Sequence, residues 1–166
     1  MTKDQYIRMT QAVRRVCDRL PGGAAWLRVP TYCCAAAYLF ALTTLMLRRD
    51  GRLLRLLLVP AACFLVVTVL RPLIGRQRPY DRYGAPPVGR YRPGKGKSMP
   101  SRHTASAAAI AFAVIAAFPS VPCAAVMLLL CAMIAALRVL SGQHYVSDVL
   151  AALALSFVLS AIGYLL

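Results

Sequence analysis

The segment LRVLSGQHYVSD, residues 137–148, decides the fold because it sets polar side chains between two long apolar runs. Seventeen residues without charge, 121–137, lead into it, and eighteen more, 149–166, follow it. Runs of this length are typical of membrane-spanning helices. The segment itself carries three ionisable side chains: Arg138, His144 and Asp148. Ionisable groups at a membrane boundary are costly unless they are partnered, so we expect them to have a function.

The composition of the whole chain also indicates an integral membrane protein. Of its 166 residues, 60% are hydrophobic and 15% are charged, which is unlike a soluble globular domain. Lys and Arg number 20 against 5 acidic residues, and the net charge of +15 favours an anionic partner. Nucleic acid is not expected as that partner, because the basic residues lie in short segments between apolar runs. The six cysteines lack metal-site spacing and are expected to be small buried hydrophobes.

Hydropathy predicts five membrane-spanning helices. They cover residues 31–47, 53–70, 103–118, 121–137 and 145–166. Residues 1–20 are predicted to form an amphipathic helix that lies on an anionic membrane surface, with packing on the protein itself as the alternative. Its apolar stripe consists of Met9, Val13, Val16, Cys17 and Leu20. The predicted fold is therefore all-α: a polytopic membrane helical bundle with about five transmembrane helices and an N-terminal amphipathic interfacial helix.

Five crossings bring the unusual polar segments to one membrane surface. Residues 71–102 contain nine basic residues and one acid, and they connect the second span to the third. The fourth span returns to the same surface, so residues 137–148 lie there too. We therefore expect residues 71–102 to form an active-site loop that faces the 137–148 segment.

The two histidines of the chain suggest a reaction at this surface. His144 and Asp148 are four residues apart, so on a helix their side chains share one face. The carboxylate can accept a hydrogen bond from one ring nitrogen and leave the other free as a base or nucleophile. A purely structural pair is the alternative interpretation. His103 adjoins Ser101 and Arg102 and is placed to donate a proton.

The arginines around these histidines indicate what the site binds. Guanidinium groups suit the geometry of phosphate oxygens. Phosphoryl transfer requires that the charge of the phosphoryl group is neutralised and that the leaving oxygen is protonated. The candidate phosphate-binding residues are Arg71, Arg78, Ser101, Arg102 and Arg138.

Three motifs in this order resemble the type-2 phosphatidic acid phosphatase superfamily, which carries Lys-x6-Arg-Pro, Pro-Ser-Gly-His and Ser-Arg-x5-His-x3-Asp. Here they read Arg71-x6-Arg78-Pro79, Pro100-Ser101-Arg102-His103 and Leu137-Arg138-x5-His144-x3-Asp148. The order and the spacing agree from Arg71 to the end of the chain. Three residues depart from the family's Lys, Gly and Ser: Arg71, Arg102 and Leu137.

The resemblance implies that the chain is an enzyme, a lipid phosphatase. It implies a single membrane phosphatase domain over residues 1–166. The related enzymes are undecaprenyl-diphosphatase and phosphatidylglycerophosphatase B-like enzymes. The resemblance implies that His144 is the nucleophile of a phosphohistidine intermediate and that Asp148 orients it. His103 then protonates the leaving group and later activates water. The phosphate would be held by Arg71, Arg78, Ser101 and Arg138, while Arg102 either adds a ligand or points away.

The resemblance also implies the substrate and the location. The expected substrates are lipid phosphates or diphosphates, such as those of phospholipid metabolism. The candidates are a polyprenyl diphosphate such as undecaprenyl diphosphate, phosphatidylglycerophosphate, phosphatidate and a lipid A-type phosphate. The expected location is the bacterial plasma membrane, with the active site on the extracytoplasmic side. The positive-inside rule does not decide this orientation, because the stretches 14–28 and 48–55 each carry four Arg and one Asp.

Other readings of the same residues stay open. Two histidines and a carboxylate could hold a metal, but residues 71–166 contain ten basic residues and two acids. Such a field repels cations, so we predict no metal and no cofactor. A non-catalytic membrane protein that binds anionic lipids is one alternative to an enzyme, and a lipid or anion transporter is another. Vanadate-dependent peroxidase chemistry also occurs in the superfamily, in members that are typically soluble.

Overall fold

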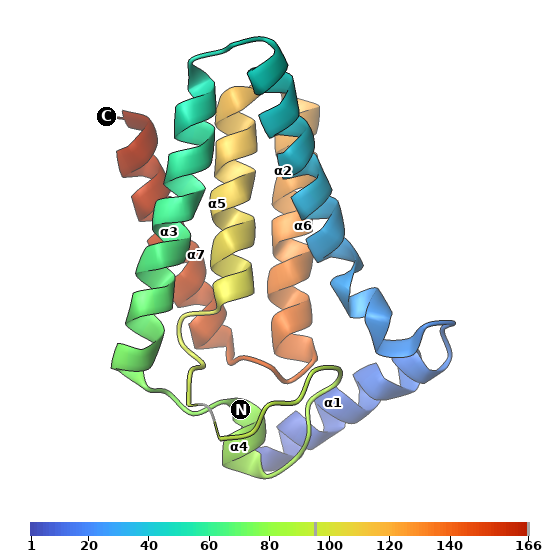
Figure 1. Cartoon of the computed structure of the whole chain (residues 1–166). Helices are drawn as coiled ribbons and strands as arrows, with labels where there is room; N and C mark the ends of the chain where they lie inside the picture. Colours follow the sequence, from blue (N-terminus) through green and yellow to red (C-terminus); the bar gives the residue numbers. More distant parts are fainter. Residues whose placement is uncertain (95, 166) are drawn as a thin grey trace.

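The computed structural model describes residues 1–94 and 96–165, and these residues form a helical bundle with loops and short helices gathered at one end (Figure 1). The elements in chain order are α1 (Lys3–Asp18), the 3-10 helix η1 (Gly23–Arg28), α2 (Val29–Leu47), α3 (Arg52–Ile74), α4 (Pro79–Tyr83), α5 (Arg102–Ala117), α6 (Val121–Leu140) and α7 (Val146–Leu165). This arrangement confirms the predicted all-α membrane bundle. Neither η1 nor α4 was predicted from the sequence.

Four stretches are long and apolar enough to cross a membrane: Gly23–Leu47, Arg52–Tyr83, Val121–Leu140 and Val146–Leu165. The remaining predicted span, α5, is apolar but has only 16 residues. Large apolar side chains on the outer helix faces are exposed, as a lipid-facing surface requires, including Leu39, Phe40, Leu65 and Phe157. Cys33 is also exposed, contrary to the expectation that the cysteines are buried.

Helix α5 stands in the centre of the bundle because its side chains are small. It packs against α2, α3, α6 and α7, and its buried positions are mostly alanines, among them Ala105, Ala108, Ala109 and Ala111. Small residues let helix backbones approach closely, which favours association inside a membrane. Ser156 of α7 donates a hydrogen bond to the carbonyl oxygen of Ala105 at 3.1 Å, so a polar contact adds to this packing.

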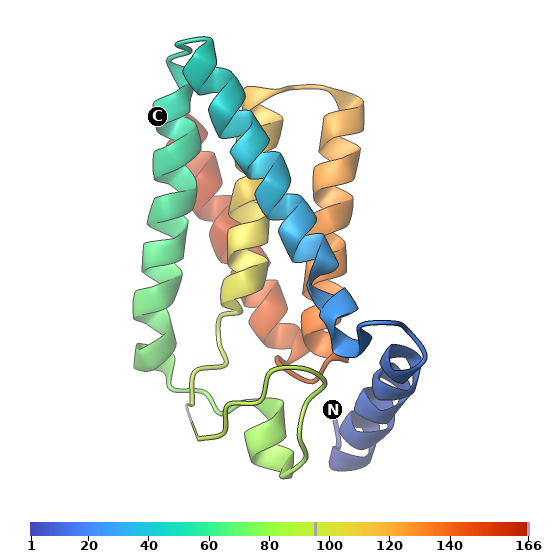
Figure 2. The ribbon, with the colours of Figure 1, turned by 45° about the vertical axis from the view of Figure 1, so that its right-hand side comes forward.

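Helix α1 lies across the end of the bundle that carries the loops (Figure 2). It begins with a capping box in which the hydroxyl of Thr2 accepts from the backbone amide of Gln5. Tyr6 is fully buried, and its hydroxyl donates to the carbonyl oxygen of Ala85 at 3.1 Å. The ring also packs directly against Gly142, so α1 contacts both loop segments of the site.

The sequence gives only part of the packing of α1. From the predicted stripe only Cys17 is buried, and Val16 and Leu20 are exposed. Thr10 is buried as well, because it lies one turn after Tyr6 on the face of α1 that packs against the protein. One face of α1 therefore packs on the protein, and an apolar edge remains available for the membrane surface.

The predicted convergence of the polar segments is confirmed. The backbone amide of Val88 donates to the carbonyl oxygen of Ser141 at 2.9 Å, and that of Ser101 donates to the carbonyl oxygen of Asp148 at 3.0 Å. The predicted loop of residues 71–102 has helical ends, however, because Arg71 belongs to the last turn of α3 and Arg102 begins α5.

Candidate active site

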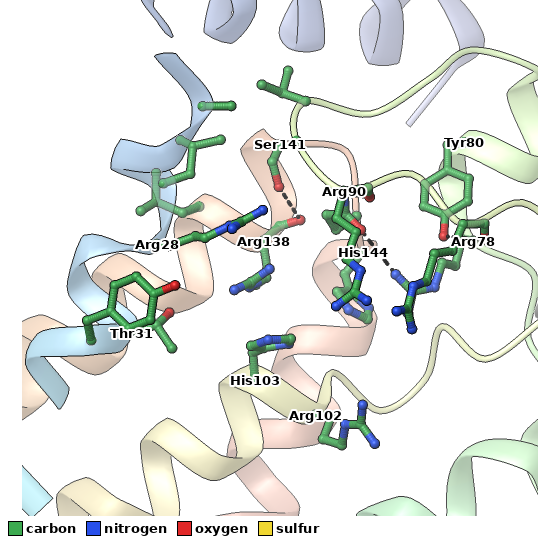
Figure 3. Close-up of a pocket in the computed structure, with 18 of the residues that line it drawn as sticks. Arg28, Thr31, Arg78, Tyr80, Arg90, Arg102, His103, Arg138, Ser141 and His144 are labelled. Atoms are coloured by element: carbon green, nitrogen blue, oxygen red, sulfur yellow. Dashed lines mark hydrogen bonds between the residues drawn. The ribbon is translucent and has the colours of Figure 1, made fainter. Parts of the chain in front are cut away.

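A cavity of about 570 Å³ opens at the loop end of the bundle. Six of the eight predicted site residues line it: Arg71, Arg78, Arg102, His103, Arg138 and His144. Figure 3 shows the side chains of Arg78, His103, Arg138 and His144 directed into one space. The guanidinium of Arg102 extends to the side and lies 5.6 Å from the centre of the Phe64 ring. The other two predicted residues, Ser101 and Asp148, lie behind the cavity wall.

The six predicted residues that line the cavity lie at helix ends or in the 137–148 segment. Arg71 and Arg138 lie in the last turns of α3 and α6, and Arg102 and His103 lie in the first turn of α5. His144 is in the connection between α6 and α7. Helix ends place side chains at the membrane boundary, which is where a substrate head group is accessible.

Two of the arginines are held by contacts with the loops. Arg71 is 7% exposed, and its Nη2 donates to the carbonyl oxygen of Lys97. Nη1 of Arg78 donates to Oε1 of Gln143 at 3.1 Å, and Nε2 of Gln143 donates to the carbonyl oxygen of Arg90 at 2.7 Å. Gln143 therefore holds the guanidinium group of Arg78 near His144, the next residue in the chain.

His144 is buried, with its Nδ1 toward Asp148. The distance from Nδ1 to Oδ2 of Asp148 is 3.6 Å, which exceeds hydrogen-bond length, and Nδ1 has no other hydrogen-bond partner within the described residues. Catalytic hydrogen bonds in unliganded sites are often long. Burial lowers the pKa of His144, and Asp148 partly offsets this effect, so the imidazole is neutral at pH 7.

Asp148 is fully buried and receives three other donors. Nη1 of Arg76 lies 2.7 Å from Oδ1, while the hydroxyl of Ser98 and the backbone amide of Tyr145 donate to Oδ2 at 2.5 and 3.0 Å. The guanidinium of Arg76 also stacks 4.4 Å from the centre of the Tyr145 ring. A buried carboxylate with this many donors stays ionised and fixed in place.

Ser101 is fully buried, and its hydroxyl pairs with that of Thr104 at 3.0 Å. As the N-cap of α5, it leaves the first-turn amides of the helix without a side-chain cap. Arg102 and His103 of this turn line the cavity. An uncapped helix N-terminus at a cavity favours an anion, so the backbone of this motif is better placed for a phosphate than the Ser101 hydroxyl.

Sequence reasoning missed several residues. Arg76 and Ser98 lie inside the predicted loop, but nothing in their spacing marks them as partners of Asp148. Three more arginines line the cavity: Arg28, Arg90 and Arg92. The last two lie in the connection between α4 and α5, where no motif marks a basic residue as part of a site. Arg28 ends η1, an element that hydropathy does not reveal.

The electrostatics of the cavity are those of an oxyanion site. Seven guanidinium groups line it, and none of the ion pairs found in residues 1–94 and 96–165 joins one of the seven to a carboxylate. Over the same residues, no group of three or more His, Cys, Asp or Glu side chains gathers. Guanidinium donors bind phosphate oxygens in paired hydrogen bonds, so the donor set of this cavity suits a phosphate.

Fold and site together define a membrane-embedded protein with two histidines in a cavity lined by arginines. The sequence profile of the PAP2 superfamily matches residues 52–166 of the chain. Among solved structures, the chain is similar to the first transmembrane PAP2-type phosphatidylglycerolphosphate phosphatase from Bacillus subtilis. The identity is 22%, the TM-score is 0.69, and the match covers 98% of this chain and 84% of that one. Comparison with curated proteins gave no match.

The chain belongs to the PAP2 superfamily. This finding confirms the resemblance drawn from the three motifs and the predicted class of enzyme, a hydrolase of phosphoric esters. The likeness to the Bacillus subtilis structure shows that the fold is shared. The chain is an integral membrane protein, as its apolar helices require.

Proposed function

We propose that the chain, acting as one phosphatase domain over residues 1–166, hydrolyses a lipid phosphate or diphosphate through a phosphohistidine and without a metal. The observation that carries this proposal is that His103 and His144 line the same cavity as the seven guanidinium groups. A phosphate bound there would have a nucleophile, a proton donor and charge-neutralising groups around it.

In the first step His144 attacks the terminal phosphorus. Its Nδ1 faces Asp148, so Nε2 is the nitrogen that is free to attack. A bond forms between Nε2 and phosphorus, the bond from phosphorus to the lipid oxygen breaks, and His103 gives its proton to that oxygen. Asp148 stabilises the positive charge that the ring of His144 then carries.

In the second step His103 accepts a proton from water. The water oxygen attacks phosphorus, the phosphorus–nitrogen bond breaks, and inorganic phosphate leaves. In both steps Arg71, Arg78 and Arg138 neutralise the equatorial oxygens, while the first-turn amides of α5 are the backbone donors nearest to the group. Guanidinium groups supply here the charge that a metal ion supplies in other phosphoryl-transfer enzymes.

The proposed substrates are polyprenyl diphosphates, phosphatidylglycerophosphate or related lipids, whose chains stay in the bilayer while the phosphate reaches the cavity. The proposed location is the bacterial plasma membrane, with this end of the bundle outside the cytoplasm. Single cysteines in place of Lys3, which begins α1, and Arg48, which follows α2, test the orientation. Helix α1 and the C-terminal end of α2 lie at opposite ends of the bundle (Figure 1). An impermeant thiol reagent should label position 3 in intact cells and not position 48; the reverse pattern would place the site inside.

The enzymatic proposal is tested with purified protein in non-ionic detergent against a panel of lipid phosphates, with and without EDTA. We expect phosphate release that EDTA does not change and that His144→Ala reduces by at least about 1000-fold. Arg15→Gln, on the exposed face of α1, serves as a matched control with normal rates. Loss of activity with EDTA would disprove the metal-free route. Lipid binding without hydrolysis would favour the anionic-lipid-binding alternative.

A further inference from the structure

The cavity continues into an apolar groove of about 300 Å³ between α2, α3, α5 and α6. The groove is lined mainly by apolar side chains, including Phe64, Ala107, Ile110 and Ile134. Three residues line both spaces: Thr31, Arg102 and His103. The proposed proton donor therefore stands at the boundary, with the transferred phosphate on one side and the lipid chain of the leaving group on the other.

Two polar groups of α2 and its entry stand on this boundary without an explained role. The hydroxyl of Thr31 is buried and has no hydrogen-bond partner within the described residues, which costs free energy unless a ligand supplies one. Arg28 is one turn earlier and lines the cavity. Its guanidinium points toward that of Arg138 (Figure 3), and like charges so placed repel unless an anion lies between them.

One phosphate does not account for all of this charge. A phosphate monoester carries a charge of about −1.5 to −2 near neutral pH, whereas seven guanidinium groups line the cavity without a carboxylate partner in the described part of the chain. A plain hydrocarbon at the boundary would leave Arg28 and the Thr31 hydroxyl without a partner, and the hydroxyl groups of glycerol would leave the charge of Arg28 unneutralised. A second phosphate attached directly to the leaving oxygen would fall beside His103 and within the same boundary region.

We propose that Arg28 and Thr31 form a second phosphate-binding site and that the substrate is a lipid diphosphate. This inference rests on the proposed function. The terminal phosphate is transferred to His144, the bridging oxygen takes the proton of His103, and the phosphate that stays on the lipid is held by Arg28 and Thr31. The lipid product is therefore a monophosphate, and its chain lies in the apolar groove.

The test compares farnesyl diphosphate with farnesyl monophosphate in non-ionic detergent, with kcat/KM measured by phosphate release. The unaltered protein should prefer the diphosphate by at least about 10-fold, since hydrogen bonds to charged groups are worth roughly 10- to 100-fold in binding. Arg28→Gln should lower kcat/KM for the diphosphate by about 10- to 100-fold and for the monophosphate far less. Thr31→Val, which keeps the shape of the side chain, should act in the same direction with a smaller loss.

Each other outcome contradicts the inference in a recognisable way. Equal kcat/KM for the two substrates, or equal losses in Arg28→Gln, would mean that no second phosphate is bound at this boundary. If Arg28→Gln changes kcat/KM only in vesicles of anionic phospholipid, Arg28 binds the head group of a neighbouring phospholipid and not the substrate. If the unaltered protein hydrolyses neither farnesyl substrate nor any other lipid phosphate, the proposed function itself fails, and this inference fails with it.

Discussion

Substitution of Gly142 tests how α1 supports the 137–148 segment, which carries the proposed nucleophile. Its backbone has φ of +75°, and a Cβ atom added there would lie 2.7 Å from Cε2 and from the hydroxyl oxygen of Tyr6, and 2.8 Å from Cγ2 of Thr10. Both neighbours are buried, so neither has room to withdraw. Gly142→Ala must therefore strain the backbone, push α1 away from the bundle, or displace the turn that leads to His144.

The loss of folding stability expected for Gly142→Ala has two parts. A left-handed backbone costs an alanine roughly 1–2 kcal/mol, and overpacking a filled site costs about 1–3 kcal/mol more. Gly84 provides the matched control, because its φ is +65° and no atom lies within 4 Å of an added Cβ. We expect Gly84→Ala to show only the first part, and Gly142→Ala to lose about 2–5 kcal/mol in all.

Unfolding by sodium dodecyl sulfate in mixed micelles, followed by circular dichroism, measures both free energies of unfolding. Phosphate release measures the second consequence: kcat of Gly142→Ala should fall by roughly 100-fold, since a shift of about 1 Å in a catalytic group costs that much. Gly84→Ala should keep its rate. Equal losses of stability in the two variants would refute the claim that α1 packs tightly on this turn.

Two further predictions concern the proposed nucleophile, His144, and the contacts of Asp148. Because burial lowers the pKa of His144 below the usual 6.5, an NMR titration of its ring in a His103→Gln variant, where it is the sole histidine, should give a midpoint below pH 6.5. The ring of His144 then binds a proton more tightly in the unfolded state than in the folded state, so the free energy of unfolding should fall as the pH drops below 6.5. An NMR midpoint above pH 6.5 would contradict the burial of this ring. Arg76→Leu should lower the free energy of unfolding by about 1–3 kcal/mol, because it removes a charged donor from the buried carboxylate of Asp148. Arg76→Lys should recover part of that loss in the same detergent titration, and full stability of the leucine variant would show that the ion pair contributes nothing.

The sequence was sufficient to place six of the eight predicted residues on one cavity, for a simple reason. Hydropathy predicts the number of membrane crossings. Whether an odd or an even number of crossings precedes a polar segment determines the membrane surface at which that segment lies. Motif spacing then identifies the residues near each helix end. Arg71, Arg102 and Arg138 were found in this way, because the ends of α3, α5 and α6 coincide with the motifs.

The sequence does not predict which side chains pair with one another. Nine basic residues lie in residues 71–102, and only the structure selects Arg76 for Asp148. It does so because α3 ends at Ile74 and is capped by Gly75, whose φ of +61° turns the chain immediately before Arg76. Ser101 shows the converse case: its motif was found, but as the residue before α5 it is enclosed by the helix start and pairs with Thr104.

The short length of α5 connects the fold to the chemistry. At 1.5 Å per residue, its 16 residues extend about 24 Å, whereas the 23 residues of α3 extend about 34 Å. The N-terminus of α5 therefore begins deeper in the bundle than the neighbouring helix ends (Figure 1), and the cavity lies in the resulting recess. Charges in such a recess are less screened than on an open surface. In the proposed mechanism the guanidinium groups would therefore act on a bound phosphate more strongly than surface arginines would, and His103, in the first turn of α5, stands where the cavity meets the apolar groove.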